Sequence, residues 1–165
     1  MASTEDLPAA SGIEDVWTYP RPPALQRVPQ RVRIMFGGQT IALTDAAWRV
    51  LETSHPPVYY LPPSAFPDGV LEPAQGTSFC EWKGLARYWS VRSGSQFAER
   101  AGWSYPEPDP AYAALRDHVA VYAGAMQACF VGDEQVTPQP GGFYGGWVTR
   151  NLKGPFKGGP GSMGW

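Results

Sequence analysis

The high content of glycine and proline limits what this 165-residue chain can fold into more than any other feature. The sequence carries 19 glycines and 18 prolines. Glycine weakens the interior of a helix and proline interrupts it, and both residue types favour turns. We therefore expect short strands joined by many turns, and no long helix.

Charge and hydropathy exclude several kinds of partner. The net charge is −2 with acidic and basic residues evenly spread, so no basic patch marks a nucleic-acid-binding surface. The apolar runs fall far short of the roughly 20 residues that span a bilayer, which excludes a membrane partner. Glu5 and Asp6 lie where a signal peptide would be apolar, so we expect a cytoplasmic protein. In that compartment Cys80 and Cys129 are expected to stay reduced and unpaired.

Alternating apolar residues predict strands. The pattern over Val32–Phe36 has the period of two that is typical of a half-buried strand. Gly37-Gly38 follows it, and Ile41 and Leu43 resume the alternation. This arrangement predicts a tight β-hairpin with Ile41 and Leu43 on its buried face.

Similar patterns predict the other elements. Asp45 is expected to cap a brief helical turn, and Asp109 with Pro110 to start one short helix that ends near His118. Further strands are expected over residues 49–53, 58–61, 79–82, 85–91, 102–105, 119–122, 128–131 and 144–149. The sequence therefore predicts a mostly β fold: a single compact domain of about nine short strands, arranged as a curled sheet or open barrel, with one short helix.

Composition divides the chain into three stretches. Residues 1–30 are polar and proline-rich, which predicts a flexible N-terminal arm. Residues 16–19 interrupt that polarity, and two alternatives are that they dock on the domain or on a second subunit of a homodimer. Residues 31–139 form the domain proper. Residues 140–165 are too aromatic for a linker and are expected to wrap over the same globule, with apolar surface covered by Phe143, Tyr144, Trp147, Phe156 and Trp165.

Several common site chemistries lack the residues that they need. Structural zinc is usually held by four ligands at short spacings. Here Cys80 and Cys129 are isolated, and neither His55 nor His118 lies beside them at ligand spacing. The glycines of residues 154–162 do not match a phosphate-binding loop, because two prolines remove donors and no helix is predicted to follow. We therefore expect no metal and no cofactor, and we interpret His55 as a turn residue and His118 as a helix-end residue.

The segment Cys80-Glu81-Trp82-Lys83-Gly84 is the most specific stretch of the sequence. In a strand, Cys80 and Trp82 share one face and Glu81 and Lys83 the other. If Lys83-Gly84 forms a turn, Lys83 can reach back toward Cys80, and a nearby ammonium favours the reactive thiolate. The alternative is an inert, buried cysteine with a solvated lysine.

At these residues the chain resembles a bacterial family catalogued as domain of unknown function 427, which also carries a nucleotidyltransferase label. The resemblance covers roughly residues 31–123. It is carried by Glu52-Thr53, Tyr60-Leu61-Pro62, Cys80-Glu81-Trp82-Lys83-Gly84-Leu85-Ala86-Arg87-Tyr88-Trp89 and Trp103-Ser104-Tyr105-Pro106. The glycine-rich end resembles an extension found in one subgroup.

The resemblance implies a fold of the β-tent or barrel kind and a single cleft. It makes Glu52, Cys80 and Lys83 the candidate catalytic residues. The residues implied to bind the ligand are Tyr60, Trp82, Trp103, Tyr105 and Arg87.

Three functions remain open at this point. The first is the binding of a small polar or anionic molecule in an aromatic-walled cleft, where Lys83 and Glu52 fix a polar group. The second is an enzyme that uses Cys80 or Lys83 in group transfer. The third is a structural or protein-interaction domain.

Overall fold

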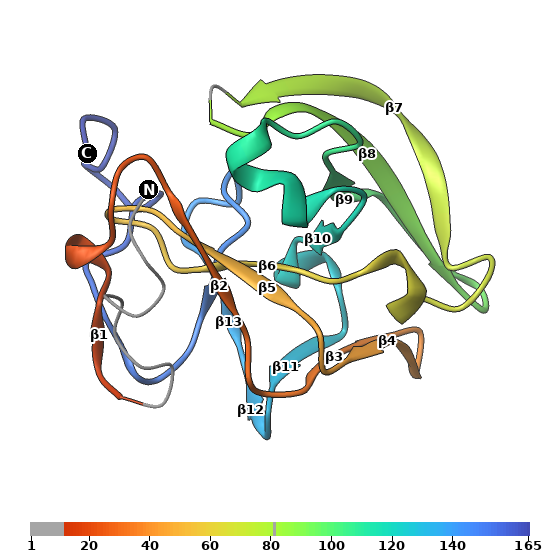
Figure 1. Ribbon diagram of the computed structural model, residues 1–165. Helices are drawn as coiled ribbons and strands as arrows, with labels where there is room; N and C mark the ends of the chain where they lie inside the picture. The colour runs from red at the N-terminus through yellow and green to blue at the C-terminus, as the bar shows by residue number, and fades with distance from the viewer. Residues whose placement is uncertain (1–11, 81) are drawn as a thin grey trace.

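A computed structural model of the chain describes residues 12–80 and 82–165. The described part is mostly β, as the sequence predicted, and its sheets are open: none of them closes into a barrel (Figure 1). No helix of the described residues is both long enough and apolar enough to cross a membrane. Many of its strands are only two to six residues long, which agrees with the abundance of turn residues.

Three larger sheets make up the fold. The first has the order β10 (Val119–Val121), β9 (Gln96–Ser104), β8 (Gly84–Ser93) and β7 (Leu71–Cys80). The second has the order β12 (Glu134–Gln135), β11 (Ala128–Val131), β3 (Val32–Phe36) and β4 (Gln39–Thr44). The third has the order β2 (Ala24–Arg27), β5 (Trp48–Leu51) and β6 (Val58–Tyr60). The long, curved strands β7 and β8 arch along one side of the molecule, with β3 and β4 at another (Figure 1).

Smaller pairings connect these sheets. The backbones of Leu61 and Val119 exchange two hydrogen bonds, which joins the end of β6 to β10. Two further two-stranded sheets are formed by segments near the chain ends. They are β1 (Glu14–Asp15) with β15 (Leu152–Lys153), which is parallel, and β13 (Thr137–Pro138) with β14 (Trp147–Val148), which is antiparallel.

The predicted hairpin is present, but its second strand buries a different pair of residues from the one expected. Val32, Ile34 and Phe36 are buried as predicted. In β4, however, Ile41 and Ala42 are both buried while Leu43 is 45% exposed. The register shifts opposite Ile34, so that an extra residue is inserted into β4. Such a β-bulge resets the alternation of faces, which strict period-two reasoning cannot anticipate.

The short helix predicted after Asp109 is a kinked 3₁₀ helix. No α-helix occurs in the part of the chain that the structure describes. The helical elements of that part are short 3₁₀ helices: η2 (Val16–Thr18), η3 (Pro63–Ala65), η4 (Pro110–Leu115) and η5 (Ala123–Ala125). In η4, Tyr112 and Leu115 are both buried. Residues three apart eclipse each other in a 3₁₀ helix, so this geometry buries both side chains together. The helical turn predicted at Asp45 is absent: the chain there is a bend that leads into β5.

The N-terminal segment is part of the globule from residue 12 onward, which corrects the prediction of a flexible arm over residues 1–30; residues 1–11 lie outside the described residues. β2 pairs with β5, and Val16 is fully buried against Leu51. The carboxylate of Glu14 forms an ion pair of 2.9 Å with the guanidinium of Arg49, and both side chains are almost fully buried. The Tyr19 hydroxyl donates to the other oxygen of Glu14 at 2.6 Å.

The C-terminal segment also packs on the domain, with one exception to the expectation. Trp147 is fully buried, stacks on Tyr59 at 5.0 Å, and donates from its indole to the carbonyl of Val121. Phe143, which was expected to cover apolar surface, is instead 75% exposed. Tyr144, Phe156 and Trp165 are half-buried.

The buried ion pair generates a first prediction. Arg49→Met should lower the free energy of unfolding by about 3–5 kcal/mol, because it leaves the Glu14 carboxylate buried without its cation. Urea denaturation measures the change. The matched control is Arg31→Met, which removes the exposed ion pair with Asp45 and should leave the midpoint almost unchanged. A loss below about 1 kcal/mol for Arg49→Met, the range of exposed pairs, would contradict this account.

The packed C-terminal segment generates a second prediction. Truncation after Gly142 removes Trp147 and should lower the melting temperature markedly or leave the protein insoluble, since burying a large aromatic side chain stabilises a fold by several kcal/mol. Thermal denaturation followed by circular dichroism measures it. The control variant Met163→Ala shortens a side chain of the same segment that is 96% exposed, and it should leave the melting temperature almost unchanged. Identical melting curves for the Gly142 truncation and the full chain would disprove the prediction.

Candidate functional site

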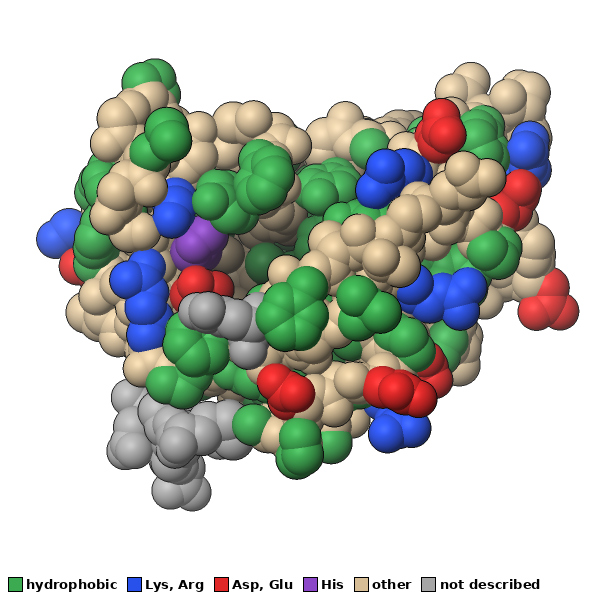
Figure 2. Space-filling view, turned by 90° about the horizontal axis from the view of Figure 1, so that it is seen from above, with side chains coloured by type: hydrophobic (Ala, Val, Ile, Leu, Met, Phe, Trp, Pro, Cys, Tyr) green, Lys and Arg blue, Asp and Glu red, His purple; other side chains and the backbone are tan. Residues whose placement is uncertain are grey.

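A cleft of about 530 Å³ lies between the third sheet, the ends of the first sheet and the C-terminal segment. Its volume falls in the range of small-molecule sites. Figure 2 shows a hollowed face with hydrophobic side chains gathered around the depression and charged and histidine side chains at one edge. The residues that carry its chemistry are Glu52, His55, Tyr60, Cys80, Lys83, Trp103, Tyr105, Tyr122, Phe143 and Tyr144.

The alternation of side chains along a strand determines which residues in and next to β5 and β6 line the cleft. Val50 and Glu52 lie two residues apart and both line the cleft, as does Tyr60 on β6. Tyr59 lies on the other side of β6, where it stacks on Trp147 in the core. Alternation along these two strands therefore separates a core face from a cleft face.

The turn after β5 is held by both ends of the described chain. The Ser54 N–H donates to the carbonyl of Val16 at 3.0 Å, and the Ser54 carbonyl accepts from the N–H of Lys157 at 2.8 Å. The turn is closed by a bond from the His55 N–H to the Glu52 carbonyl at 3.0 Å. These bonds fix Glu52 and His55 at the cleft by tertiary contacts with distant segments.

Lys83 lies in the turn between β7 and β8 and is buried, with only 7% of the residue exposed. Its carbonyl accepts a hydrogen bond from the N–H of Asp109 at 3.2 Å. Gly84 has a φ of +105°, which favours glycine, and a Cβ atom there would lie in van der Waals contact with the carbonyl of Glu107. The turn therefore lies against residues 107–109, and the Lys83 side chain lines the cleft.

The surroundings of Lys83 keep it protonated. Burial alone would lower the pKa of Lys83. The nearby Tyr60, the hydrogen-bonded thiol of Cys80 and the carboxylate of Glu52 outweigh that effect, so the pKa is raised above its ordinary value. The ammonium also lies 5.8 Å from the centre of the Tyr105 ring. The cleft therefore contains a buried cation at neutral pH.

The floor of the cleft is a group of packed aromatic residues. The Tyr60 hydroxyl accepts from the indole of Trp103 at 3.3 Å, and the ring centroids of Tyr60 and Tyr105 lie 6.2 Å apart. Burial raises the pKa of both tyrosines. Both therefore stay neutral phenols, which can donate or accept hydrogen bonds beside Lys83.

Gln139 fixes the tautomer of His55. The Gln139 side-chain oxygen accepts from the N–H of Gly146 at 3.0 Å, and its Nε2 donates to the carbonyl of Lys157 at 2.8 Å. The same Nε2 lies 3.1 Å from His55 Nδ1. Since this amide nitrogen can only donate, Nδ1 must accept and the proton of a neutral imidazole sits on Nε2. That nitrogen lies 3.9 Å from a carboxylate oxygen of Glu52.

His55 is neutral because its surroundings oppose protonation. Burial lowers its pKa to about 4, and the positive charges of Lys157, Arg21 and Lys83 act in the same direction. The shift persists although the carboxylate of Glu52 lies close by. Burial and the nearby cations therefore both favour the neutral imidazole.

The structure gathers most of the predicted site residues in one place. Six of them line the cleft together: Glu52, Tyr60, Cys80, Lys83, Trp103 and Tyr105. Two others do not line it. The Arg87 guanidinium stacks over Trp89 at 4.4 Å, and Trp82 is half-buried against the edge of a hydrophobic cluster. On a strand, Arg87 falls on the opposite face from Tyr88, which does line the cleft.

Sequence reasoning missed His55, Gln139 and the aromatic residues of the C-terminal segment that reach the cleft. His55 follows Glu52 by three residues and precedes two prolines, a pattern from which a fixed turn beside a carboxylate could have been recognised. Gln139 lies between Pro138 and Pro140, and nothing in that pattern signals its role. Its function comes from contacts between segments far apart in the sequence.

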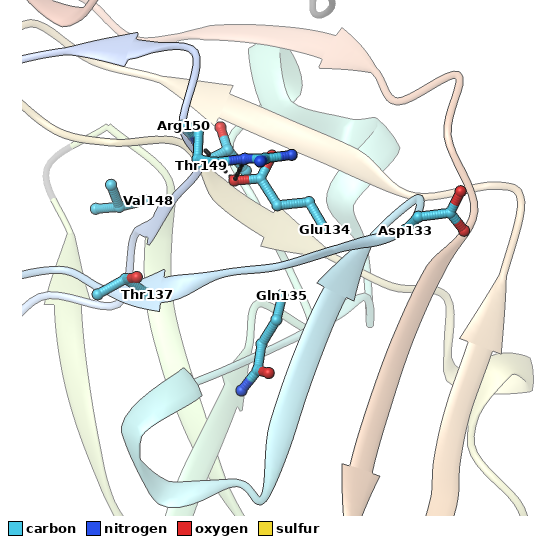
Figure 3. A pocket seen from close by; sticks show the side chains of 7 residues that line it. All are labelled: Asp133, Glu134, Gln135, Thr137, Val148, Thr149 and Arg150. Atoms are coloured by element: carbon cyan, nitrogen blue, oxygen red, sulfur yellow. Dashed lines mark hydrogen bonds and ion pairs between the residues drawn. The ribbon is translucent and has the colours of Figure 1, made fainter.

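A second depression, of about 390 Å³, is less suited to ligand chemistry (Figure 3). Asp133 and Glu134 are its carboxylates, and Glu134 already accepts from the N–H of Arg150 at 2.7 Å and lies 3.5 Å from the Arg150 guanidinium. The Arg150 side chain is 89% exposed. The residues described around this depression include no aromatic side chain and no buried cation. We therefore take the aromatic cleft as the candidate site.

Comparison with known proteins gives one match. A family model described as a domain of unknown function (DUF427) matches residues 24–132, about two thirds of the chain. No curated protein matches the sequence. The matched region includes Glu52, Cys80 and Lys83 but ends before Gln139 and Tyr144.

The buried histidine generates a third prediction. The folded pKa of about 4 lies below the ordinary value of about 6.5, so the unfolded chain binds the proton more readily. Stability is complete above pH 6.5 and should fall as the pH drops toward 4, with a slope of up to about 1.4 kcal/mol per pH unit from this group. Urea denaturation between pH 4 and 7 measures it. His55→Gln should flatten this part of the profile, and an unchanged slope in that variant would refute the assignment.

Proposed function

The chain belongs to the family described as domain of unknown function 427, and we propose that its aromatic cleft binds a small anionic ligand through Lys83. The observation that carries this proposal is the ammonium of Lys83, which is buried in the cleft beside the phenols of Tyr60 and Tyr105. A buried charge is costly unless it is paired, and an anion that enters the cleft supplies such a partner.

The other charges of the cleft support an anion over a cation. Lys83 and Lys157 both line it, and Glu52 is its acidic lining residue. The lowered pKa of His55, caused by burial and then by surrounding cations, reflects the same excess of positive charge. Among the described residues no ion pair joins Lys83 to Glu52, so the proposed ligand can approach the ammonium without breaking one.

The raised pKa of Lys83 argues against a role as an amine nucleophile. Schiff-base lysines are activated by a lowered pKa, which gives them a free amine at neutral pH. Lys83 has the opposite shift and stays charged. A charged lysine holds and orients an anionic group, which is the role proposed for it.

A fourth prediction tests this proposal with simple anions. The panel consists of aliphatic carboxylates, aromatic carboxylates and inorganic phosphate. At least one of these anions should raise the melting temperature of the wild-type protein, because a ligand at 100 times its Kd stabilises the folded state by about 2.7 kcal/mol. Lys83→Met should abolish the shift. The exposed Lys153 provides the matched control, because Lys153→Met removes the same charge far from the cleft.

A second variant keeps the test informative if Lys83→Met folds poorly. Glu52→Gln removes the nearby negative charge and should increase the shift caused by the same anion, opposite in direction to Lys83→Met. Equal shifts in wild type, Lys83→Met and Glu52→Gln would overturn the proposal. A panel without any stabilising anion would do the same, and would favour a structural or protein-interaction domain.

A thiol enzyme is the second candidate function, and one contact favours it. The Cys80 thiol lines the cleft together with Lys83, close enough to affect its pKa. An ammonium beside a thiol is an arrangement found around nucleophilic cysteines.

Cys129 is the internal control: it is 1% exposed, and burial raises its pKa to about 12. Iodoacetamide at pH 7 should then modify Cys80 faster than the buried Cys129, and Lys83→Met should slow the reaction of Cys80 because the neighbouring ammonium is lost; an unchanged Cys80 rate in that variant would exclude a thiol activated by Lys83.

A further inference from the structure

Two rows of aromatic rings bound the cleft. In the sheet row, the rings of Trp103 and Tyr122 have centroids 4.8 Å apart. In the C-terminal row, Tyr144 contacts His55 at 4.9 Å and Phe143 at 4.8 Å, both edge to face. All five side chains line the same cleft. The walls are therefore ring surfaces that come from segments far apart in the chain.

The two rows meet at one end. A Cβ atom added to Gly145 would lie 2.1 Å from the Trp103 ring, so the backbone of the C-terminal row already contacts the sheet row there. The Tyr122 hydroxyl also donates to the carbonyl of Phe143 at 3.5 Å. These contacts join one wall to the other, and the side chains of both rows line the cleft. Aromatic ring surfaces that line a cleft suit a flat aromatic group.

The outer part of the cleft is unusually apolar for an exposed surface. Phe79, at the end of β7, is 74% exposed, and Phe143 on the C-terminal row is 75% exposed. Both line the cleft. Exposed apolar patches of this kind mark ligand-binding grooves. A ligand with an apolar body would cover these two side chains, whereas a small inorganic anion held at Lys83 would not.

The charge of the cleft is localised on one buried side chain. The Lys83 ammonium is a single point charge, while the second lysine, Lys157, donates to the main-chain oxygen of Trp165 at 2.9 Å and lies over the Tyr144 ring at 5.7 Å. Phosphate sites typically combine several donors, such as arginine forks or helix N-termini. The described lining residues include no arginine. One ammonium beside neutral phenols matches a carboxylate better than a phosphate.

From these features we infer that the ligand is a planar aromatic carboxylic acid, with its carboxylate at Lys83 and its ring between the two aromatic rows. This inference rests on the proposed anion site and adds a second subsite to it. An aliphatic acid satisfies Lys83 alone and a neutral aromatic molecule satisfies the rows alone, so only an aromatic acid uses both parts. An aromatic ring has a negative face and a positive edge, so aromatic pairs prefer stacked or edge-to-face arrangements. The rings of the two rows can form such pairs with a flat aromatic ligand.

The test compares two acids with the same carbon skeleton, one planar and aromatic, the other saturated and puckered. 2-Naphthoate and its saturated counterpart, decahydro-2-naphthoate, are titrated into the full-length protein by calorimetry. The naphthoate should bind roughly two- to tenfold more tightly, which corresponds to the usual gain from aromatic pairing beyond buried area. Phe143→Ala should reduce this ratio toward one without unfolding the protein, because Phe143 is largely exposed. Phe97→Ala, at an exposed phenylalanine of β9 that does not line the cleft, is the matched control and should leave the ratio unchanged.

The outcomes separate this inference from the proposal beneath it. If both acids bind equally well and both lose binding in Lys83→Met, the anion site stands and the aromatic subsite is refuted. If neither acid binds in a Lys83-dependent way, both are refuted. If 2-naphthyl phosphate binds more tightly than 2-naphthoate with the same dependence on Lys83 and Phe143, the carboxylate assignment is wrong and the aromatic slot remains.

Discussion

The buried ion pair between Glu14 and Arg49 is the interaction on which the arrangement of the cleft depends. Arg49 lies on β5, the central strand of the third sheet, and points away from the cleft. Its guanidinium is buried only because the N-terminal segment covers it with Glu14, while Gln26 of β2 accepts its Nε–H at 2.6 Å. The same N-terminal segment holds the turn at Ser54. The ion pair of Arg49, on one face of β5, thus fixes the position of the opposite face and of the turn that follows the strand.

Local patterns were enough to predict much of the sheet framework and part of the site. Alternating apolar residues identified Val32–Phe36 and the hairpin that follows it. The turn at Lys83-Gly84 was also expected from the sequence, and its position between β7 and β8 explains why Lys83 can reach Cys80. These features depend on residues a few positions apart, so a periodic pattern or a glycine reveals them.

What sequence reasoning missed depends on contacts between distant segments. The bulge in β4 inserts a residue at Ile41 and leaves Leu43 exposed, and no propensity marks that position. The N-terminal segment has the composition of a flexible arm, yet Glu14 and Val16 are fully buried because they meet partners from β5. The role of Gln139 likewise follows only once the C-terminal segment is folded against His55. Polar residues that serve tertiary contacts carry no local signal.

The division of the cleft between its two walls has a consequence for how related chains diverge. The sheet row and Lys83 lie within the region that the family model matches, whereas Phe143, Tyr144 and Gly145 lie beyond it. Substitutions in the C-terminal wall can therefore reshape the slot without altering the pairing of the three larger sheets. For the proposed function, such substitutions change the fit of the ligand at the C-terminal wall and leave the buried lysine and the sheets that hold it in place.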